Sequence, residues 1–158
     1  MKTLYIVRHA KTNKSLNDLD RVLLPLGIER THKLGTYLQS NNYSVDRVFS
    51  SFATRAMQTA TILANHLSYP QDKIVAKEDL YLTSQEEYFD ILMEQDDTVD
   101  SVLIVGHNPE ITSVAQFFVP DFMSYMQTGA CFCFDFKTDK WTNIFTAERV
   151  VRFYTRFQ

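Results

Sequence analysis

The stretch Leu4-Tyr5-Ile6-Val7-Arg8-His9-Ala10 decides the fold class of this 158-residue chain. Its first four residues are bulky and apolar, a short run that is typical of a buried strand. The run ends at Arg8 and His9, so a cation and an imidazole stand at the carboxyl end of the predicted strand. Open α/β sheets bind their ligands at this end of their strands. The stretch therefore predicts an α/β fold and a candidate site together.

Strand-like and helix-like patterns alternate through the first two-thirds of the chain. Short apolar runs predict further strands over residues 45–51, 73–77 and 101–105. Helical spacing predicts helices over residues 25–40, 54–67, 84–95 and 109–118. After Gly129 the pattern changes to strands over 131–136, 141–145 and 150–157 with short connections. We therefore expect a three-layer α/β/α sandwich with a mostly parallel central sheet and antiparallel edge strands.

Several helix boundaries have local signals. Pro25 suits the first turn of a helix, because the N–H that proline lacks would have no intrahelical partner at that position in any residue. Ser84 followed by Glu87 forms a capping-box pattern and predicts a helix that begins at this point. Thr54 is the expected cap of the helix that carries Arg55.

The composition is that of an ordinary soluble globular protein, with 45% hydrophobic and 22% charged residues. We expect one domain over residues 1–158, in the cytoplasm, because the sequence shows no signal-peptide pattern and no run of about 20 apolar residues. A formal net charge of −3 without a basic block argues against nucleic-acid binding. Cys131 and Cys133 are expected to be small buried residues, neither a disulfide nor a metal site.

Three separate strand ends carry groups that suit a phosphate. Arg8 and His9 follow the first strand, Arg55 opens the helix after the second, and His107 lies in the turn after residues 101–105. Arginine binds phosphate oxygens with a planar, permanently charged fork. A helix N-terminus adds backbone N–H donors, and an imidazole that is neutral near physiological pH is a nucleophile. An Arg-His pair, a helix cap or an Asn-Pro turn is uninformative alone, but their joint occurrence indicates a phosphate site.

The motifs resemble those of the histidine phosphatase (phosphoglycerate mutase-like) superfamily, and most closely its SixA-type phosphohistidine phosphatases. The resemblance extends to about Pro120. It rests on Arg8-His9-Ala10, on Ser51 with Thr54-Arg55-Ala56-Met57-Gln58-Thr59-Ala60, on Val105-Gly106-His107-Asn108-Pro109, and on Asp20-Arg21-Val22-Leu23 through Gly27. Val22 and Phe52 stand where the family usually has proline, and Phe52 is expected to alter the pocket wall.

The resemblance implies a role for each matched residue. His9 would accept the phosphoryl group, Arg8 and Arg55 would clamp it, and His107 would complete the pocket. Thr12 and Arg21 are weaker candidates for contacts with the phosphate or the substrate. The implied activity is a phosphatase that needs no metal or other cofactor and acts through a covalent phosphohistidine intermediate.

The general acid has no clear candidate in the sequence. Phosphomonoesters release poor leaving groups, and Glu78 or Asp79, after residues 73–77, could supply the proton. The alternative for this pair is a solvated acidic turn. A phosphohistidine substrate relaxes the requirement, because its imidazole leaves already protonated on the distal nitrogen. Protein phosphohistidine is therefore the expected substrate.

Two other activities stay open, a small-molecule phosphomonoesterase and a non-catalytic module that binds a phosphorylated ligand. The other two histidines, His32 and His66, are expected on helix surfaces without partners.

Overall fold

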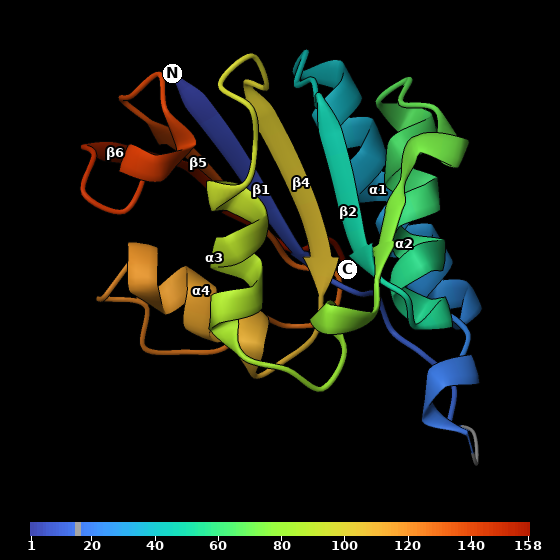
Figure 1. The fold of residues 1–158 in the computed structure, drawn as a ribbon. Helices are drawn as coiled ribbons and strands as arrows, with labels where there is room; N and C mark the ends of the chain where they lie inside the picture. Colours follow the sequence, from blue (N-terminus) through green and yellow to red (C-terminus); the bar gives the residue numbers. More distant parts are fainter. Residues whose placement is uncertain (15–16) are drawn as a thin grey trace.

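Six strands form one sheet in the computed structural model of this chain, which describes residues 1–14 and 17–158 (Figure 1). Their order across the sheet is β3-β2-β4-β1-β5-β6. The strands are β1 (Lys2–Arg8), β2 (Arg47–Ser51), β3 (Val75–Lys77), β4 (Ser101–Gly106), β5 (Cys131–Phe136) and β6 (Arg149–Thr155). The α-helices are α1 (Pro25–Ser40), α2 (Thr54–His66), α3 (Gln85–Met93) and α4 (Glu110–Phe118). Short 3-10 helices are η1 (Asp18–Asp20), η2 (Gln71–Lys73), η3 (Glu78–Leu80) and η4 (Trp141–Asn143).

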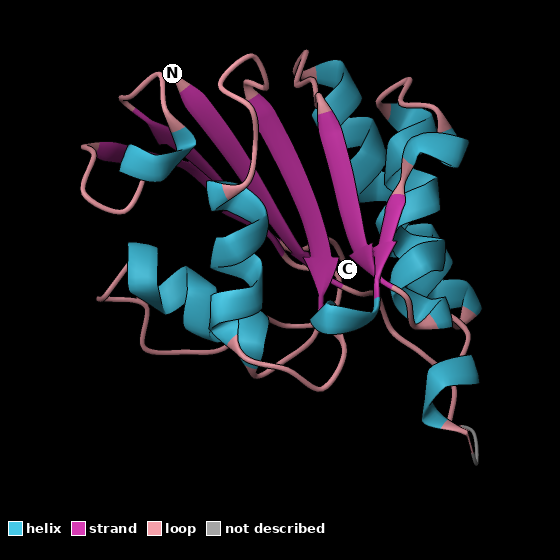
Figure 2. Ribbon diagram, viewed as in Figure 1, coloured by secondary structure: helices cyan, strands magenta, loops and turns pink. Residues whose placement is uncertain are grey.

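The sheet is mostly parallel, as the sequence predicts. Strand β1 pairs in parallel with β4, β4 with β2, and β2 with β3. Strands β5 and β6 add an antiparallel edge beside β1. The parallel strands therefore end at one common edge, where their arrowheads lie together in Figure 2.

Alternate residues of β1 face two different cores, because successive side chains of a strand point to opposite faces of the sheet. Leu4 and Ile6 pack in a cluster with residues of α3 and α4. Tyr5 and Val7 pack in a second cluster with residues of α1 and α2. The two helix pairs cover the two faces of the sheet (Figure 1). The expected three-layer sandwich is thus confirmed.

One expected strand is wrong. Residues 141–145, predicted as a strand, instead contain η4. Trp141 and Ile144 are three residues apart and both fully buried, which is the spacing of a tight helical turn rather than of a strand. The indole N–H of Trp141 donates to the carbonyl of Val99 over 2.7 Å, which anchors the turn to the segment just before β4. The adjacent β6 pairs directly with β5 and completes the edge.

The structure confirms the predicted starts of α1 and α3, but not the predicted side-chain caps. Pro25 opens α1, and Ser84 is the N-cap of α3. However, the Ser84 side chain makes no capping hydrogen bond. The N-cap of α2 is Ala53, so the expected cap by Thr54 is wrong. The hydroxyl of Ser51 accepts from the N–H of Ala53 over 3.3 Å, and this bond supports the turn into α2.

Cys131 and Cys133 are buried and free, as the sequence predicts. Among residues 1–14 and 17–158, no helix combines the length and the apolar character that crossing a membrane requires.

His32 and His66 are near the surface, but the expectation that they have no partners is wrong. Nδ1 of His32 lies 2.9 Å from Nε2 of His66, so the two rings share a hydrogen bond between α1 and α2. Neither position gave a sequence signal, because the contact depends on how the two helices pack.

Candidate functional site

The three candidate strand ends meet because β4 lies between β1 and β2 in the sheet. His9 follows β1, Arg55 lies in the first turn of α2 after β2, and His107 follows β4. The backbone N–H of His9 donates to the carbonyl of Gly106 over 3.1 Å, so the two histidine-bearing turns are joined directly. The ring centroids of His9 and His107 are 5.1 Å apart.

His9 is held in one orientation. Its Nδ1 lies 2.9 Å from the carbonyl oxygen of Ala10, which can only accept, so Nδ1 carries the proton. The N–H of Ala10 is in turn fixed by the hydroxyl of Thr59 at 3.1 Å. His9 Nε2 keeps its lone pair, which accepts a hydrogen bond from the Nε–H of Arg55 over 3.4 Å. Burial, reinforced by the nearby positive charges, lowers the pKa of His9 to about 3. The ring is therefore neutral at physiological pH.

His107 is a second buried and neutral imidazole. Its Nε2 lies 2.7 Å from the hydroxyl oxygen of Ser51, and its backbone N–H donates to the Tyr88 hydroxyl over 3.2 Å. Burial first, and then the charge of Arg55, lower the pKa of His107 to about 4. Nδ1 of His107 is buried and has no hydrogen-bond partner among the described residues. Such an atom is costly unless a ligand satisfies it.

Arg8 and Arg55 supply two fixed positive charges beside these rings. Arg8 donates from NH1 to the carbonyl of Met126 over 3.0 Å, and its buried Nε has no partner among the described residues. Burial, and to a lesser extent the charge of Arg55, lower the pKa of Arg8. Both arginines also lower the pKa of His9. His9, Arg55 and His107 thus lie together, and the charges of Arg8 and Arg55 both act on the His9 ring.

Arg55 is itself held by Asp18, a residue that the sequence analysis missed. NH1 of Arg55 donates to the backbone carbonyl of Asp18 over 2.7 Å, and NH2 lies 3.1 Å from Oδ2 of its carboxylate. The Arg55 side chain is 7% exposed, whereas that of Asp18 is 47% exposed. The guanidinium therefore spans from the buried Nε2 of His9 to a carboxylate at the mouth of the site.

Three further side chains converge on or near this carboxylate. The Tyr81 hydroxyl donates to Oδ2 of Asp18 over 2.6 Å, and NH1 of Arg21 lies 3.1 Å from Oδ1. Arg21 also donates from NH2 to the hydroxyl of Thr12 over 2.5 Å. The Tyr81 hydrogen bond, followed by the two arginines, lowers the pKa of Asp18 to about 2. The predicted candidates Thr12 and Arg21 are thus connected to Arg55 through Asp18.

Tyr81 was also missed, and it forms part of an aromatic wall. Its ring centroid lies 5.7 Å from that of Phe52 and 5.7 Å from that of His107, both edge-to-face. The guanidinium of Arg55 lies 6.0 Å from the centre of the Tyr81 ring. Tyr81 directly follows η3, the same strand end that drew attention to Glu78 and Asp79. The sequence signal that could have identified Tyr81 is its place as an aromatic residue close to the acidic pair.

Glu78 and Asp79 lie in η3 and are exposed to solvent. Among the described residues, neither side chain forms a hydrogen bond or an ion pair with the two histidines or the two arginines of the pocket. The structure therefore shows no direct bond between this acidic pair and the pocket among the described residues.

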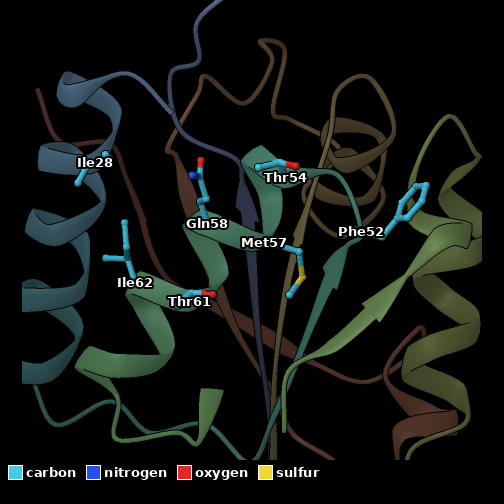
Figure 3. A pocket seen from close by; sticks show the side chains of 7 residues that line it. All are labelled: Ile28, Phe52, Thr54, Met57, Gln58, Thr61 and Ile62. Atoms are coloured by element: carbon cyan, nitrogen blue, oxygen red, sulfur yellow. The ribbon is translucent and has the colours of Figure 1, made fainter. Parts of the chain in front are cut away.

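An apolar hollow of about 490 Å³ lies beside the pocket, between α1 and α2. Its lining includes Ile28 of α1, Ile62 and Gln58 of α2, and Phe52 at its edge (Figure 3). Gln58 accepts a hydrogen bond from the backbone N–H of Leu23 over 2.8 Å, which ties the start of α1 to α2. None of the described residues that line this hollow is titratable, so it offers no acid or base of its own.

No cluster of three or more histidine, cysteine, aspartate or glutamate side chains suited to a metal occurs in the described part of the chain. The pocket holds two arginines instead of carboxylate ligands. Its fixed positive charges and neutral imidazoles suit a tetrahedral oxyanion.

Comparison with known proteins agrees with this geometry. Residues 4–81 match the family profile of the histidine phosphatase superfamily (branch 1). The uncharacterized protein MT1313 of Mycobacterium tuberculosis (strain CDC 1551 / Oshkosh) is 33% identical over 111 residues, which cover 69% of this chain and 67% of that protein.

Solved structures show the same fold. SixA from Agrobacterium tumefaciens superposes with a TM-score of 0.82 at 21% identity, over 98% of this chain and 97% of that chain. The protein histidine phosphatase SixA complexed with tungstate gives 0.83 at 17% identity, over 98% of this chain and 96% of that chain. The fold is thus phosphoglycerate mutase-like, and a phosphatase activity is supported. From its sequence matches and its architecture, this chain belongs to the histidine phosphatase superfamily.

Proposed function

We propose that residues 1–158 form one histidine phosphatase domain, which removes a phosphoryl group from protein phosphohistidine through a covalent phospho-His9 intermediate. One observation carries this proposal most directly. Nδ1 of His9 is occupied by the carbonyl of Ala10, while Nε2 faces the guanidinium of Arg55. A neutral nitrogen lone pair therefore lies beside the charge that would hold the phosphate.

In the first step, the Nε2 lone pair of His9 attacks phosphorus and forms an N–P bond. The N–P bond of the substrate breaks, and its electron pair stays on the leaving imidazole. That imidazole carries a proton on its distal nitrogen, so it departs as a neutral molecule. His9 keeps its Nδ1 proton throughout, and its ring becomes cationic while it is phosphorylated.

In the second step, a water oxygen attacks phosphorus on the phosphorylated His9. The N–P bond breaks, its electron pair returns to Nε2, and both hydrogens of the water leave with the dihydrogen phosphate ion. His9 is then neutral again, with its proton on Nδ1. No external acid, base or reductant is needed to balance either step.

The positive charges of the pocket would stabilise the transferring phosphoryl group. Arg8 and Arg55 would bind its oxygens, and preorganised charge of this kind stabilises the transition state without reorganisation. The hydroxyl of Ser51 would donate to Nε2 of His107, which leaves an N–H at Nδ1 as a further oxygen donor. These groups take the place that a metal ion holds in other phosphatases, so activity is expected to be insensitive to EDTA.

The carboxylates favour an N–P substrate over an O–P substrate. Asp18 is ionised and bound to two arginines, which makes it a poor proton donor at neutral pH. Glu78 and Asp79 are exposed in η3. An alkoxide leaving group would need a proton, and none of these three side chains makes a described hydrogen bond to the pocket histidines, whereas an imidazole leaving group needs no such proton.

The test is a comparison of donors on the purified protein. We expect turnover of a phosphorylated histidine-containing carrier protein in the presence of EDTA, and loss of turnover in His9→Ala. Turnover of phosphomonoesters that collapses in Glu78→Gln or Asp79→Asn would instead identify a small-molecule phosphomonoesterase. Binding of phosphate without turnover of any donor would identify a non-catalytic binding module.

A further inference from the structure

The carboxylate of Asp18 puts a negative charge next to Arg55, the arginine proposed to bind the phosphate. Its side chain is 47% exposed, on the opposite end of the Arg55 guanidinium from His9. A dianionic phosphate gains nothing from such a neighbour, since like charges repel. The position therefore needs an explanation beyond phosphate binding.

Among the described residues, three hydrogen bonds reach this carboxylate. It accepts from Arg21 through Oδ1 and from Arg55 and Tyr81 through Oδ2. An ionised carboxylate offers about four lone-pair sites, so the described residues leave one acceptor position open on a side chain that is 47% exposed. Arg21 and Arg55 hold the carboxylate in place, and it stays charged because it is stabilised on both oxygens.

The surface next to this open position is aromatic. Phe52 is 37% exposed, and its ring meets that of Tyr81 edge-to-face at 5.7 Å. Tyr81 in turn contacts the ring of His107 at 5.7 Å. A flat cation can bind over such rings and pair with a carboxylate at their edge. An imidazolium has this shape and charge, whereas an alcohol or sugar leaving group has no positive charge.

We propose that Asp18 is a specificity-determining residue that binds the protonated distal nitrogen of the phosphohistidine ring, with Tyr81 and Phe52 as the wall against which that ring lies. The proposal rests on the proposed function and deepens it. Without Asp18, the imidazolium would approach Arg21 and Arg55 unshielded. With Asp18 present, the negative charge at the mouth of the pocket favours a substrate that carries a positive charge and disfavours a phosphomonoester, which carries none.

The experiment compares N-phosphoimidazole with p-nitrophenyl phosphate at about pH 6, where an imidazole nitrogen is largely protonated. Asp18→Asn is expected to lower kcat/KM for N-phosphoimidazole about tenfold, the usual effect of losing one charge-assisted hydrogen bond. Turnover of p-nitrophenyl phosphate is expected to stay the same or rise. Asp18→Glu keeps the charge and is expected to retain most of the preference.

Asp20→Asn is the matched control, because Asp20 belongs to the same 3-10 helix and the change removes the same charge. It is expected to leave both rates unchanged. An equal loss on both substrates in Asp18→Asn would mean that Asp18 merely positions Arg55, and an equal gain would mean that it competes with phosphate. Either result, or no change at all, overturns the proposal.

A binding measurement separates this proposal from the proposed function. In a His9→Ala background, calorimetry with N-phosphoimidazole and with inorganic phosphate gives the ratio of the two affinities without turnover. We expect adding Asp18→Asn to reduce that ratio about tenfold, whether or not the wild-type protein hydrolyses either compound. An unchanged ratio contradicts the role of Asp18, whereas absence of turnover in the wild-type protein contradicts only the proposed function.

Discussion

Nδ1 of His9 lies 2.9 Å from the carbonyl oxygen of Ala10, and this hydrogen bond leaves Nε2 as the ring nitrogen that faces Arg55. The pair is adjacent in sequence, so the orientation of the nucleophile is built into the turn after β1. The hydroxyl of Thr59 fixes the same turn from α2 by accepting from the N–H of Ala10. The geometry of the proposed nucleophile thus depends on two elements that meet at the sheet edge.

The neutral state of the two pocket histidines is testable by NMR. Burial lowers the pKa of His9 to about 3 and that of His107 to about 4, from an ordinary value of 6.5. We expect their ring resonances, assigned with His9→Asn and His107→Asn, to stay at the neutral positions from pH 8 down to about pH 5. Titration of either ring near pH 6.5 would contradict the buried, neutral pocket.

The same shifts predict how stability depends on pH. Between pH 6.5 and about 4, the unfolded chain binds protons at these two positions that the folded chain does not bind, so acidification lowers the free energy of unfolding. Urea denaturation in this pH range is expected to show a smaller loss in His107→Asn than in the wild-type protein. An identical loss in both proteins would argue against a depressed pKa at this position.

We expect catalysis to depend on the planar guanidinium group of Arg55 and not on its charge alone. It donates through three nitrogens, to His9, to the backbone of Asp18 and to the Asp18 carboxylate. Arg55→Ala should lower kcat/KM by about 10²–10³, and Arg55→Lys should recover little, because an ammonium group cannot reproduce the fork. Arg47→Ala is the control, since Arg47 is exposed at the other end of β2. Full activity in Arg55→Lys would refute the role of the fork.

Gly106 is expected to be indispensable for packing beneath His107. A Cβ at this position would lie 2.0 Å from the Tyr88 hydroxyl oxygen and 2.8 Å from its ring carbon. Gly106→Ala should therefore cost about 1–3 kcal/mol of stability by overpacking. Denaturation of the double variant with Tyr88→Phe checks the cause. Removing the hydroxyl should recover part of the loss, and strictly additive effects would exclude this contact as the source.

The sequence predicted the layers and the centre of the site, because both follow from local patterns. Alternation along β1 places Leu4 and Tyr5 toward different cores, and strand ends place His9 and His107 at one edge. Such patterns involve neighbouring residues and need no knowledge of tertiary packing.

The misses depend on contacts between distant segments. Asp18 reaches Arg55 across 37 residues and Tyr81 across 63, and nothing in the sequence around Asp18 indicates that meeting. The expected strand at 141–145 failed for a related reason. Trp141 is anchored by the carbonyl of Val99, 42 residues away, and this long-range bond overrides the strand-like alternation.

The most direct test of the central claim is rapid-quench trapping of phosphate on the enzyme during turnover of a ³²P-labelled phosphohistidine protein. A covalent phospho-His9 intermediate predicts an acid-labile, alkali-stable label that peptide mapping assigns to His9, and no label in His9→Ala. Turnover that proceeds without any labelled enzyme, or a label on His107 in place of His9, would contradict it.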